Sequence, residues 1–455
     1  MYKILSSLLL LILGMAAFLF NLVTILEILL ILIYVIALIK SYRCMGRVNV
    51  LFLFLVSFGT FNLSRIFISL VSSYSWSTGY MYVDYSFDVD TQLFVLFVLF
   101  CFIGFVNLAL DFVVSNNSNY FPIINNNPKL EKVSSWAMLV AFIPLTYRKI
   151  LEINAMSGLA YSDVYVSTEL FIGIPFYLKG WNMLFEFSFY LFLISFPKKK
   201  KFIIFSVLFI FIEALTAING GRTGLVVGVF LILSVYSYLF RLKLSLRFMS
   251  LGVLLILFSQ VISSLRSFQS VTRGLVTNIN NFFIEQGGSM NVIAFNFINN
   301  NRYLTDSHFN IFSPIYDGIM AMLYTSTWQT QSEELVGMSL SLGAQLSFAL
   351  NQEFYLKGFG IGGNNLAEVY NFAGFFGVAI FAIGVVKVIN FCENAKWSRF
   401  TLFMFIPFIK ALFISPRASV FPNFQDLVTS FMLYMFFQFM ILFFFSKKKS
   451  VKELV

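Results

Sequence analysis

The chain has 455 residues, of which 59% are hydrophobic and only 11% are charged. No soluble domain of this size is so apolar, so the composition excludes a soluble enzyme and predicts an all-α polytopic membrane protein with one membrane domain, residues 1–455. The formal net charge of +10 would suggest a nucleic acid partner in a soluble protein, but membrane proteins concentrate Lys and Arg in cytoplasmic loops. We therefore expect the lipid bilayer as a partner and no nucleic acid.

Apolar runs of helix length divide the chain into about 12 candidate transmembrane helices. The first run has the charged start and apolar core of a signal peptide, but a second apolar run follows at once, so we interpret it as an uncleaved first span. The predicted spans are residues 4–20, 22–39, 49–73, 91–113, 135–151, 176–196, 202–218, 224–240, 248–263, 364–391, 400–414 and 427–446.

Short clusters of Lys and Arg predict the orientation of these spans. If the N-terminus lies in the cytoplasm, every cluster falls on that side, which places both termini in the cytoplasm. The same orientation places a long loop, residues 264–363, on the outer side between the ninth and tenth spans, and loops of this length are usually functional. Within it, residues 276–299 and 315–328 are predicted to form interfacial amphipathic helices. The clusters are Lys40, Arg43 and Arg47; Lys129 and Lys132; Lys198 to Lys201; Arg241, Lys243 and Arg247; Lys396 and Arg399; and Lys447 to Lys449.

Several arginines map to the outer side, where the charge rule disfavours them. Arg222 lies in a Gly-Gly-Arg-Thr turn between two predicted spans. Its guanidinium offers a planar fork of donors that suits a phosphate group. Arg266, Arg273 and Arg417 map to the same side, so all four are candidates for binding a diphosphate. The alternative is that such side chains snorkel toward lipid headgroups or helix ends.

The segment Gly358–Gly377, GFGIGGNNLAEVYNFAGFFG, lies where the long loop re-enters the membrane. Its glycines allow tight turns. Asn364, Glu368 and Asn371 then recur at i, i+4 and i+7, which places them on one face of the following helix. A carboxylate in such a position is costly unless it is hydrated, paired or used in chemistry, so we expect a functional site here. The predicted substrate-binding residues are Asn364, Asn365, Tyr370 and Asn371.

Three residues are candidates for a general base. Glu368 is the first choice because its half-buried position near a helix start could tune its acidity, although a helix dipole could also be its only partner. Glu285, in the run Ile-Glu-Gln-Gly-Gly-Ser, is the second. His308, the only histidine, is the third, and its polar surroundings also fit an ordinary loop.

The sequence does not predict a metal or any other cofactor. Asp88-Val-Asp90 has a D-x-D spacing that some metal-dependent glycosyltransferases use, but such short patterns arise by chance and no His or Cys lies nearby. The glycines from Gly358 to Gly363 do not follow a strand, so they are not a dinucleotide-binding fingerprint.

Three motifs, in this order along the chain, resemble the Wzy-type O-antigen polymerases, a family that shares a fold with the O-antigen ligases. The likeness covers essentially the whole chain. The motifs are the turn Gly220-Gly221-Arg222-Thr223; Glu285-Gln286-Gly287-Gly288-Ser289; and Gly358-x-Gly360-Ile361-Gly362 with Ala367-Glu368-x-Tyr370 and Phe372-x-Gly374-x-x-Gly377.

One departure separates the chain from the ligases. They carry a His-Asn pair, nine intervening residues and then Gly-x-x-Gly, and that histidine is implicated in catalysis. Here the same spacing ends at Gly374 and Gly377 but begins with Gly363-Asn364. The histidine position is therefore a glycine, which argues against a ligase and moves the base to another residue, for which Glu368 is the first choice.

The resemblance implies a metal-independent, polyprenyl-diphosphate-dependent glycosyltransferase in the bacterial inner membrane, with its active site facing the periplasm. Its substrates would be oligosaccharide repeat units linked to undecaprenyl diphosphate, which is released on polymerisation. A chain-length regulator and the flippase of the same pathway would be partners. The alternatives are a lipid-linked oligosaccharide flippase, which would not need the long outer loop, and a ligase-like transferase.

Overall fold

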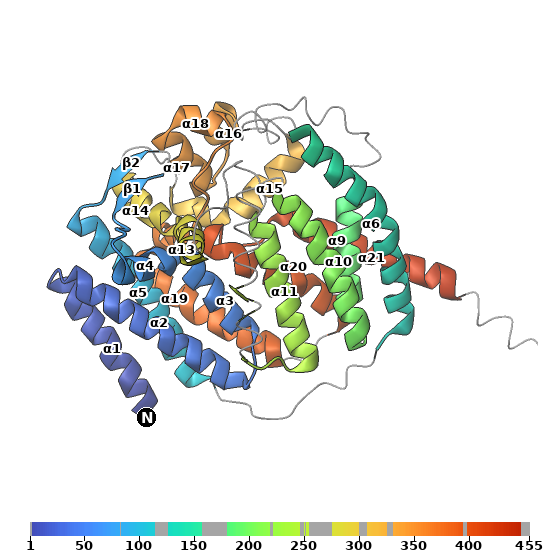
Figure 1. Ribbon diagram of the computed structural model, residues 1–455, viewed down its shortest axis with the longest axis horizontal. Helices are drawn as coiled ribbons and strands as arrows, with labels where there is room; N and C mark the ends of the chain where they lie inside the picture. The colour runs from blue at the N-terminus through green and yellow to red at the C-terminus, as the bar shows by residue number, and fades with distance from the viewer. Residues whose placement is uncertain are drawn as a thin grey trace, which may run out of the picture. The chain divides into compact units, whose positions relative to one another are not determined.

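The computed structural model describes residues 2–81, 83–113, 126–156, 180–218, 222–245, 250, 252–253, 275–299, 307–324, 331–394 and 398–446 (Figure 1). Within them the protein is almost entirely helical, and strands β1 (Thr78–Tyr80) and β2 (Asp84–Ser86) form one short antiparallel hairpin. The all-α fold that the composition predicts is confirmed.

Six of the described helices are long and apolar enough to cross a membrane, and three shorter apolar helices accompany them. These nine coincide with predicted spans. The segments 135–151 and 427–446 lie within α6 and α21, whereas the predicted span 248–263 lies almost entirely outside the described residues. The chain is an integral membrane protein with several helical spans.

The chain folds as two compact units. The first contains residues 1–118, 241–395 and 411–422, and the second contains residues 119–240, 396–410 and 423–455. Helix α20 (Arg399–Ile414) contributes to both, since the division falls after Lys410.

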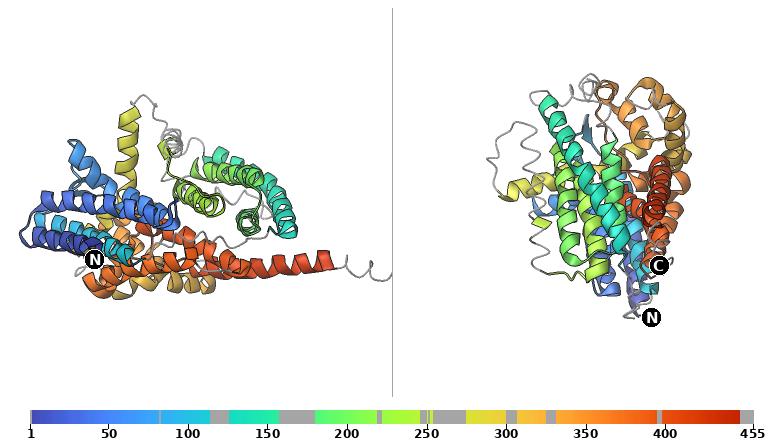
Figure 2. Two further views of the ribbon diagram at one scale, coloured as in Figure 1. Left: turned by 90° about the horizontal axis from the view of Figure 1, so that it is seen from below. Right: turned by 90° about the vertical axis from the view of Figure 1, so that its right-hand side faces the viewer.

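Helix α5 (Val89–Phe112) is the centre of the first unit. It packs against α1 (Tyr2–Leu19), α2 (Val23–Met45) and α19 (Asn365–Asn394) (Figures 1 and 2). Almost every residue from Thr91 to Leu110 is buried. A helix that is apolar on all sides is suited to such a position, because no face needs to meet water.

A buried ion pair and a hydrogen-bonded serine join helices α1, α2 and α5. Lys40 Nζ of α2 lies 2.7 Å from Asp111 Oδ1 of α5. Ser7 of α1 donates to the other oxygen of Asp111 at 2.6 Å and accepts from Lys40 at 2.9 Å. The Asp111 side chain is only 2% exposed, so these contacts replace the water that the carboxylate has lost.

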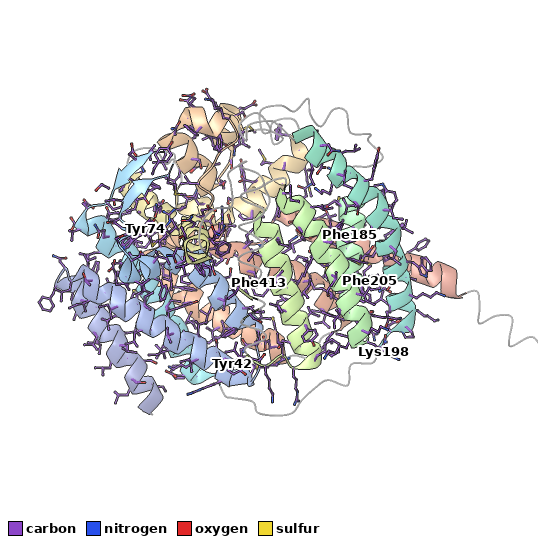
Figure 3. The ribbon with its side chains drawn as sticks, viewed as in Figure 1. Tyr42, Tyr74, Phe185, Lys198, Phe205 and Phe413 are labelled. Atoms are coloured by element: carbon purple, nitrogen blue, oxygen red, sulfur yellow. The ribbon has the colours of Figure 1, made fainter. Side chains whose placement is uncertain are left out.

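The predicted span 49–73 is one helical column with a distorted middle. It consists of α3 (Val50–Phe58), a π-helical turn at Gly59–Leu63 and α4 (Ser64–Val71). Ser57 in this column donates to the carbonyl of Phe413, which Figure 3 labels. π-Turns often occur at functional sites because they re-aim side chains, and this one positions Phe61 and Asn62.

The predicted long loop contains several short helices rather than two interfacial ones. The predicted helix 276–299 is divided at Gly287–Gly288, and its second half is largely buried against protein rather than at an interface. The predicted helix 315–328 is described from Ser313 to Leu323. The elements are α13 (Leu275–Gln286), α14 (Ser289–Asn299), η3 (Ser307–Phe312), α15 (Ser313–Leu323), α16 (Glu333–Met338), α17 (Leu342–Leu350) and α18 (Gln352–Leu356).

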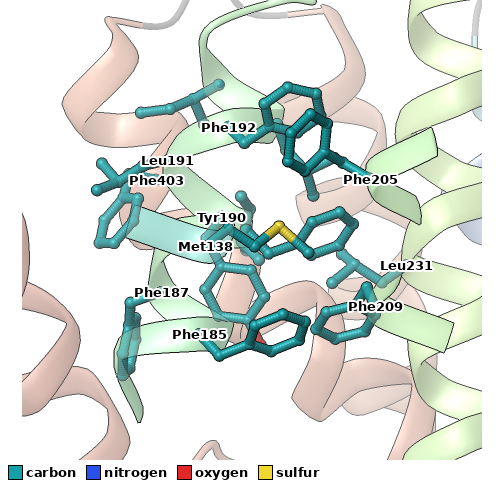
Figure 4. Packing of buried hydrophobic residues seen from close by; sticks show 14 of the residues in the cluster. Met138, Phe185, Phe187, Tyr190, Leu191, Phe192, Phe205, Phe209, Leu231 and Phe403 are labelled. Carbon is teal, nitrogen blue, oxygen red and sulfur yellow. The ribbon is translucent and has the colours of Figure 1, made fainter. Parts of the chain in front are cut away.

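Aromatic side chains fill the core of the second unit. The Phe189 and Phe209 rings stack with their centroids 4.2 Å apart. Phe185 stacks on Phe209 with ring centroids 6.1 Å apart (Figure 4). Its helices are α6 (Pro128–Met156), α9 (Trp181–Ile194), α10 (Lys199–Ile218), α11 (Arg222–Phe240), the first part of α20, and α21 (Phe424–Ser446).

A partly exposed ion pair borders this aromatic core. Lys410 pairs with Glu186, which also accepts a hydrogen bond from Tyr190. Pairing lowers the cost of placing both charges among apolar helices.

Replacement of Asp111 by Ala tests the ion pair of the first unit. Because it leaves Lys40 without its buried partner, we expect a loss of roughly 3–5 kcal/mol in stability, measured as a lower midpoint of thermal unfolding in detergent. The matched double variant Lys40→Met, Asp111→Leu removes both charges and should unfold close to the native midpoint. Equal midpoints for Asp111→Ala and the native chain would contradict this role.

Candidate functional site

The start of α19 is fixed by the side chain of Asn364, which is completely buried. Its Oδ1 accepts from the backbone amides of Leu366 at 2.9 Å and Ala367 at 3.3 Å. Asn is a favoured residue at this position because its oxygen satisfies amides that have no partner within the helix. Asn364 is therefore the cap of α19.

The side-chain nitrogen of Asn364 contacts three separate segments. Asn364 Nδ2 lies 2.7 Å from Asn62 Oδ1 of the π-turn, 2.9 Å from the carbonyl of Ser289 and 3.4 Å from that of Pro416. Asn62 Nδ2 in turn donates to the Pro416 carbonyl at 3.2 Å. Both polar atoms of Asn364 are thus occupied by protein, so Asn364 holds the site together from within.

The π-turn column also holds the Gly287–Gly288 turn between α13 and α14. Ser64 Oγ donates to the Phe283 carbonyl at 2.7 Å, and Arg65 Nε donates to the Ile284 carbonyl at 2.8 Å. A Cβ on Gly287 would lie only 2.4 Å from Ser64 Oγ. The motif favours glycine there because a Cβ would overlap the side chains of Ser64 and Arg65. Arg65 has a protein partner, as its mid-span position requires.

Arg417 lies in the segment after α20, between two supports. Its Nη1 donates to Gln286 Oε1 at 2.7 Å, and its guanidinium lies 5.8 Å from the centre of the Phe61 ring. A cation over an aromatic face is attracted by the ring's charge distribution. Arg417 is partly exposed. Its guanidinium is therefore fixed by protein contacts and still accessible at the surface, as a phosphate-binding group needs to be.

Glu368 is 1% exposed, and both of its carboxylate oxygens have donors. Ser419 Oγ donates to Oε1 at 2.7 Å, and the Val420 amide donates to Oε2 at 3.1 Å. Glu368 therefore ties α19 to the segment that carries Arg417. A substrate hydroxyl would reach the carboxylate only if one of these donors moved away.

Asn371 lies one turn further along α19, and His308 of η3 contacts it. The side chains of Asn371 and Asn296 exchange two hydrogen bonds, at 2.8 and 3.0 Å. The Asn371 carbonyl lies 2.7 Å from His308 Nδ1. Asn364 at the cap of α19, and Glu368 and Asn371 within it, thus contact neighbouring segments.

The remaining predicted substrate-binding residues also contact protein. Asn365 is completely buried, and its Nδ2 donates to Ser415 Oγ at 3.0 Å. Tyr370 is partly exposed and packs edge-on against Phe94 and Phe375. The sequence predicts a face that binds substrate, whereas much of the observed face binds the protein itself.

Glu285, the second candidate base, is exposed at the end of α13, next to the residue that accepts from Arg417. Arg222 begins α11 in the second unit, and its side chain lies outside the description. Arg266 and Arg273 lie outside the described residues. Their proposed contacts with diphosphate stay predictions.

Two further carboxylates, those of Asp317 and Asp88, accept hydrogen bonds from the protein. Asp317 accepts from Ser339 Oγ and from the Leu340 amide, and burial raises the pKa of Asp317 above its ordinary value. Asp88, the first residue of the D-x-D pattern, caps α5 by accepting from the Thr91 amide at 2.9 Å, and hydrogen bonds from Thr91 lower the pKa of Asp88. The described contacts of Asp88 are those of a helix cap.

Sequence reasoning missed three residues of this cluster: Asn62, Gln286 and Ser419. Asn62 offered a signal, because an amide in the middle of a predicted span needs a partner. Gln286 lies within the motif Glu285-Gln286-Gly287-Gly288-Ser289, where the carboxylate of Glu285 was chosen instead, and Ser419 offered no signal, since polar residues in loops are common. Their importance follows from tertiary contacts alone.

The fold and the cluster define an integral membrane protein whose polar centre is assembled from a helix start, a π-turn and two loops. A comparison with protein-family models matches residues 2–449 to the family described as O-antigen polysaccharide polymerase Wzy. The chain belongs to this family and is an O-antigen polymerase, an enzyme of polysaccharide biosynthesis that acts on lipid-linked oligosaccharide repeat units. Comparisons with curated proteins and with solved structures give no match.

Replacement of Asn364 by Asp tests the contacts of its side-chain nitrogen separately from the helix cap made by its oxygen. Asp caps helices as well as Asn does, but it presents an oxygen to the oxygens of Asn62, Ser289 and Pro416. We expect unfolding in detergent at a clearly lower temperature, with a loss of about 1–3 kcal/mol because buried acceptors lose their donor. An unchanged midpoint would mean that the cap alone matters. Replacement of the exposed Asn423 by Asp is the matched control.

Proposed function

We propose that this polymerase transfers the growing glycan from undecaprenyl diphosphate to the non-reducing end of the next lipid-linked repeat unit. The reaction takes place at the periplasmic face of the inner membrane, and undecaprenyl diphosphate leaves. The observation that carries the proposal is the guanidinium of Arg417, held between Gln286 and Phe61 at the edge of the polar cluster.

The chemistry requires charge neutralisation more than acid catalysis. As the bond between the sugar and the phosphate breaks, negative charge grows on the diphosphate, and positioned cations lower the barrier most when they are fixed beforehand. Arg417 supplies one such cation. Arg222, Arg266 and Arg273 are proposed to supply others. The energy comes from the broken phosphate ester, so the proposal needs neither ATP nor a metal ion.

Glu368 has a positioning role in this proposal. Its contacts with Ser419 and Val420 fix the segment from Ser415 to Val420, in which Arg417 lies. Because the backbone around Arg417 is already fixed, less conformational entropy is lost when the arginine binds the transition state. Glu285, which is exposed beside Gln286, is a candidate for contacts with the acceptor sugar.

The same proposal includes the orientation of the chain in the membrane and two partner proteins. Both termini lie in the cytoplasm, as the positions of the Lys and Arg clusters predict. A flippase must deliver lipid-linked units to the outer face, because their charged diphosphate does not cross an apolar bilayer unaided. A separate chain-length regulator is the further partner that we propose.

Purified protein mixed with undecaprenyl-diphosphate-linked repeat units should give a ladder of glycan lengths on a gel, also in the presence of a metal chelator. Arg417→Lys keeps the charge but loses the planar fork, so we expect its rate to fall by roughly 10²–10³-fold. Arg43→Lys, an exposed change at the end of α2, is the control. The proposal fails if the native protein forms no ladder, and the diphosphate role fails if Arg417→Lys keeps the native rate.

Glu368→Gln distinguishes positioning from proton transfer. The amide retains only one acceptor for two donors, so we expect a lower rate and a lower unfolding temperature, with an unchanged pH profile for the residual activity. If the dependence of the rate on pH disappears instead, Glu368 is the base. Glu353→Gln is the control, because Glu353 is exposed and pairs only with nearby Lys357 among the described contacts.

A further inference from the structure

Helix α19 is interrupted at Ala373 and Gly374, whose backbone angles are non-helical. Gly374 has φ 60° and ψ −151°, a conformation that is essentially restricted to glycine. In a regular helix the carbonyl of residue 371 accepts from the amide of residue 375, across these two positions. The interruption therefore leaves the Asn371 carbonyl available to a partner outside α19.

His308 is that partner. Its Nδ1 lies 2.7 Å from the Asn371 carbonyl oxygen. A carbonyl can only accept a hydrogen bond, so Nδ1 carries the proton and Nε2 keeps its lone pair. His308 is exposed, which makes this lone pair accessible to a ligand. An imidazole held in this tautomer is suited to remove a proton.

The position of the carbonyl is itself fixed. Asn371 and Asn296 are 5% and 1% exposed, and their two reciprocal hydrogen bonds join α19 to α14. Phe312, at the end of η3, packs edge-on against Phe372, with ring centres 5.8 Å apart. These contacts hold η3, and His308 with it, against the interrupted turn. The titratable groups on the adjoining turns are Glu368 and Tyr370 of α19 and Tyr316 and Asp317 of α15.

We propose, on the basis of the proposed polymerase function, that His308 is the general base of the transfer and that Gly374 and Asn296 are its positioning residues. Nε2 takes the proton of the acceptor sugar's hydroxyl. The hydroxyl oxygen then forms a bond to the anomeric carbon of the donor sugar. The bond from that carbon to the phosphate oxygen breaks, and its electron pair leaves with the diphosphate.

The first test measures ladder formation by purified His308 variants with undecaprenyl-diphosphate-linked repeat units. We expect His308→Ala to lose at least about 10²-fold in rate and added imidazole to restore part of that loss. The pH profile of the residual activity of His308→Gln should differ from that of the native protein. Phe309→Ala, an exposed change on the same turn, is the control.

Native-like activity of His308→Ala, or an unchanged pH profile for His308→Gln, would overturn the assignment. If the native protein forms a ladder and His308→Ala forms the same one, only this inference fails. If the native protein itself forms none, the proposed polymerase reaction fails first.

The second test asks whether the interrupted turn acts through His308. Gly374→Ala should lower the native rate, because alanine disfavours the observed backbone angles, but it should cause no further loss in the His308→Ala background. Equal losses in both backgrounds would show that Gly374 does not act through His308. Gly384→Ala is the matched control on α19, where a Cβ would meet open space.

Discussion

The first unit depends on one buried amide group, that of Asn364. Its oxygen caps α19, and its nitrogen holds the π-turn, the start of α14 and the segment after α20. Apolar packing alone cannot set the register of such segments, because inside a bilayer lipid tails compete equally for apolar surface. Directional polar contacts can, and a buried amide without its partners is costly.

The same constraint explains why the catalytic groups that we propose sit at the edge of the cluster. The side chains of Asn364 and Glu368 are buried and hydrogen-bonded to the protein, whereas Arg417 is partly exposed and His308 is exposed. A site of this kind needs rigid supports behind the groups that meet substrate. The polar residues at the start of α19 therefore act as supports, and the groups proposed for chemistry lie on neighbouring segments.

Hydropathy predicted most of the membrane-crossing helices because spanning length and apolar content are local properties of the sequence. Periodicity also predicted that Asn364, Glu368 and Asn371 share one face, and in the structure each of the three contacts a neighbouring segment. It could not predict what that face contacts, since Ser419 and Asn62 are distant in sequence. The close approach of Ser64 and Arg65 to Gly287 was likewise hidden, because these residues are distant in sequence.

The Lys40–Asp111 pair has a consequence for biogenesis. Helices of a membrane protein are made in chain order, so α1 and α2 leave the ribosome well before Asp111 of α5 exists. Until then Lys40, which belongs to the Lys and Arg cluster at the end of α2, can keep its charged end at the membrane surface. The α1–α2 pair can therefore enter lipid first, and Lys40 and Ser7 form a ready site for the carboxylate that α5 brings.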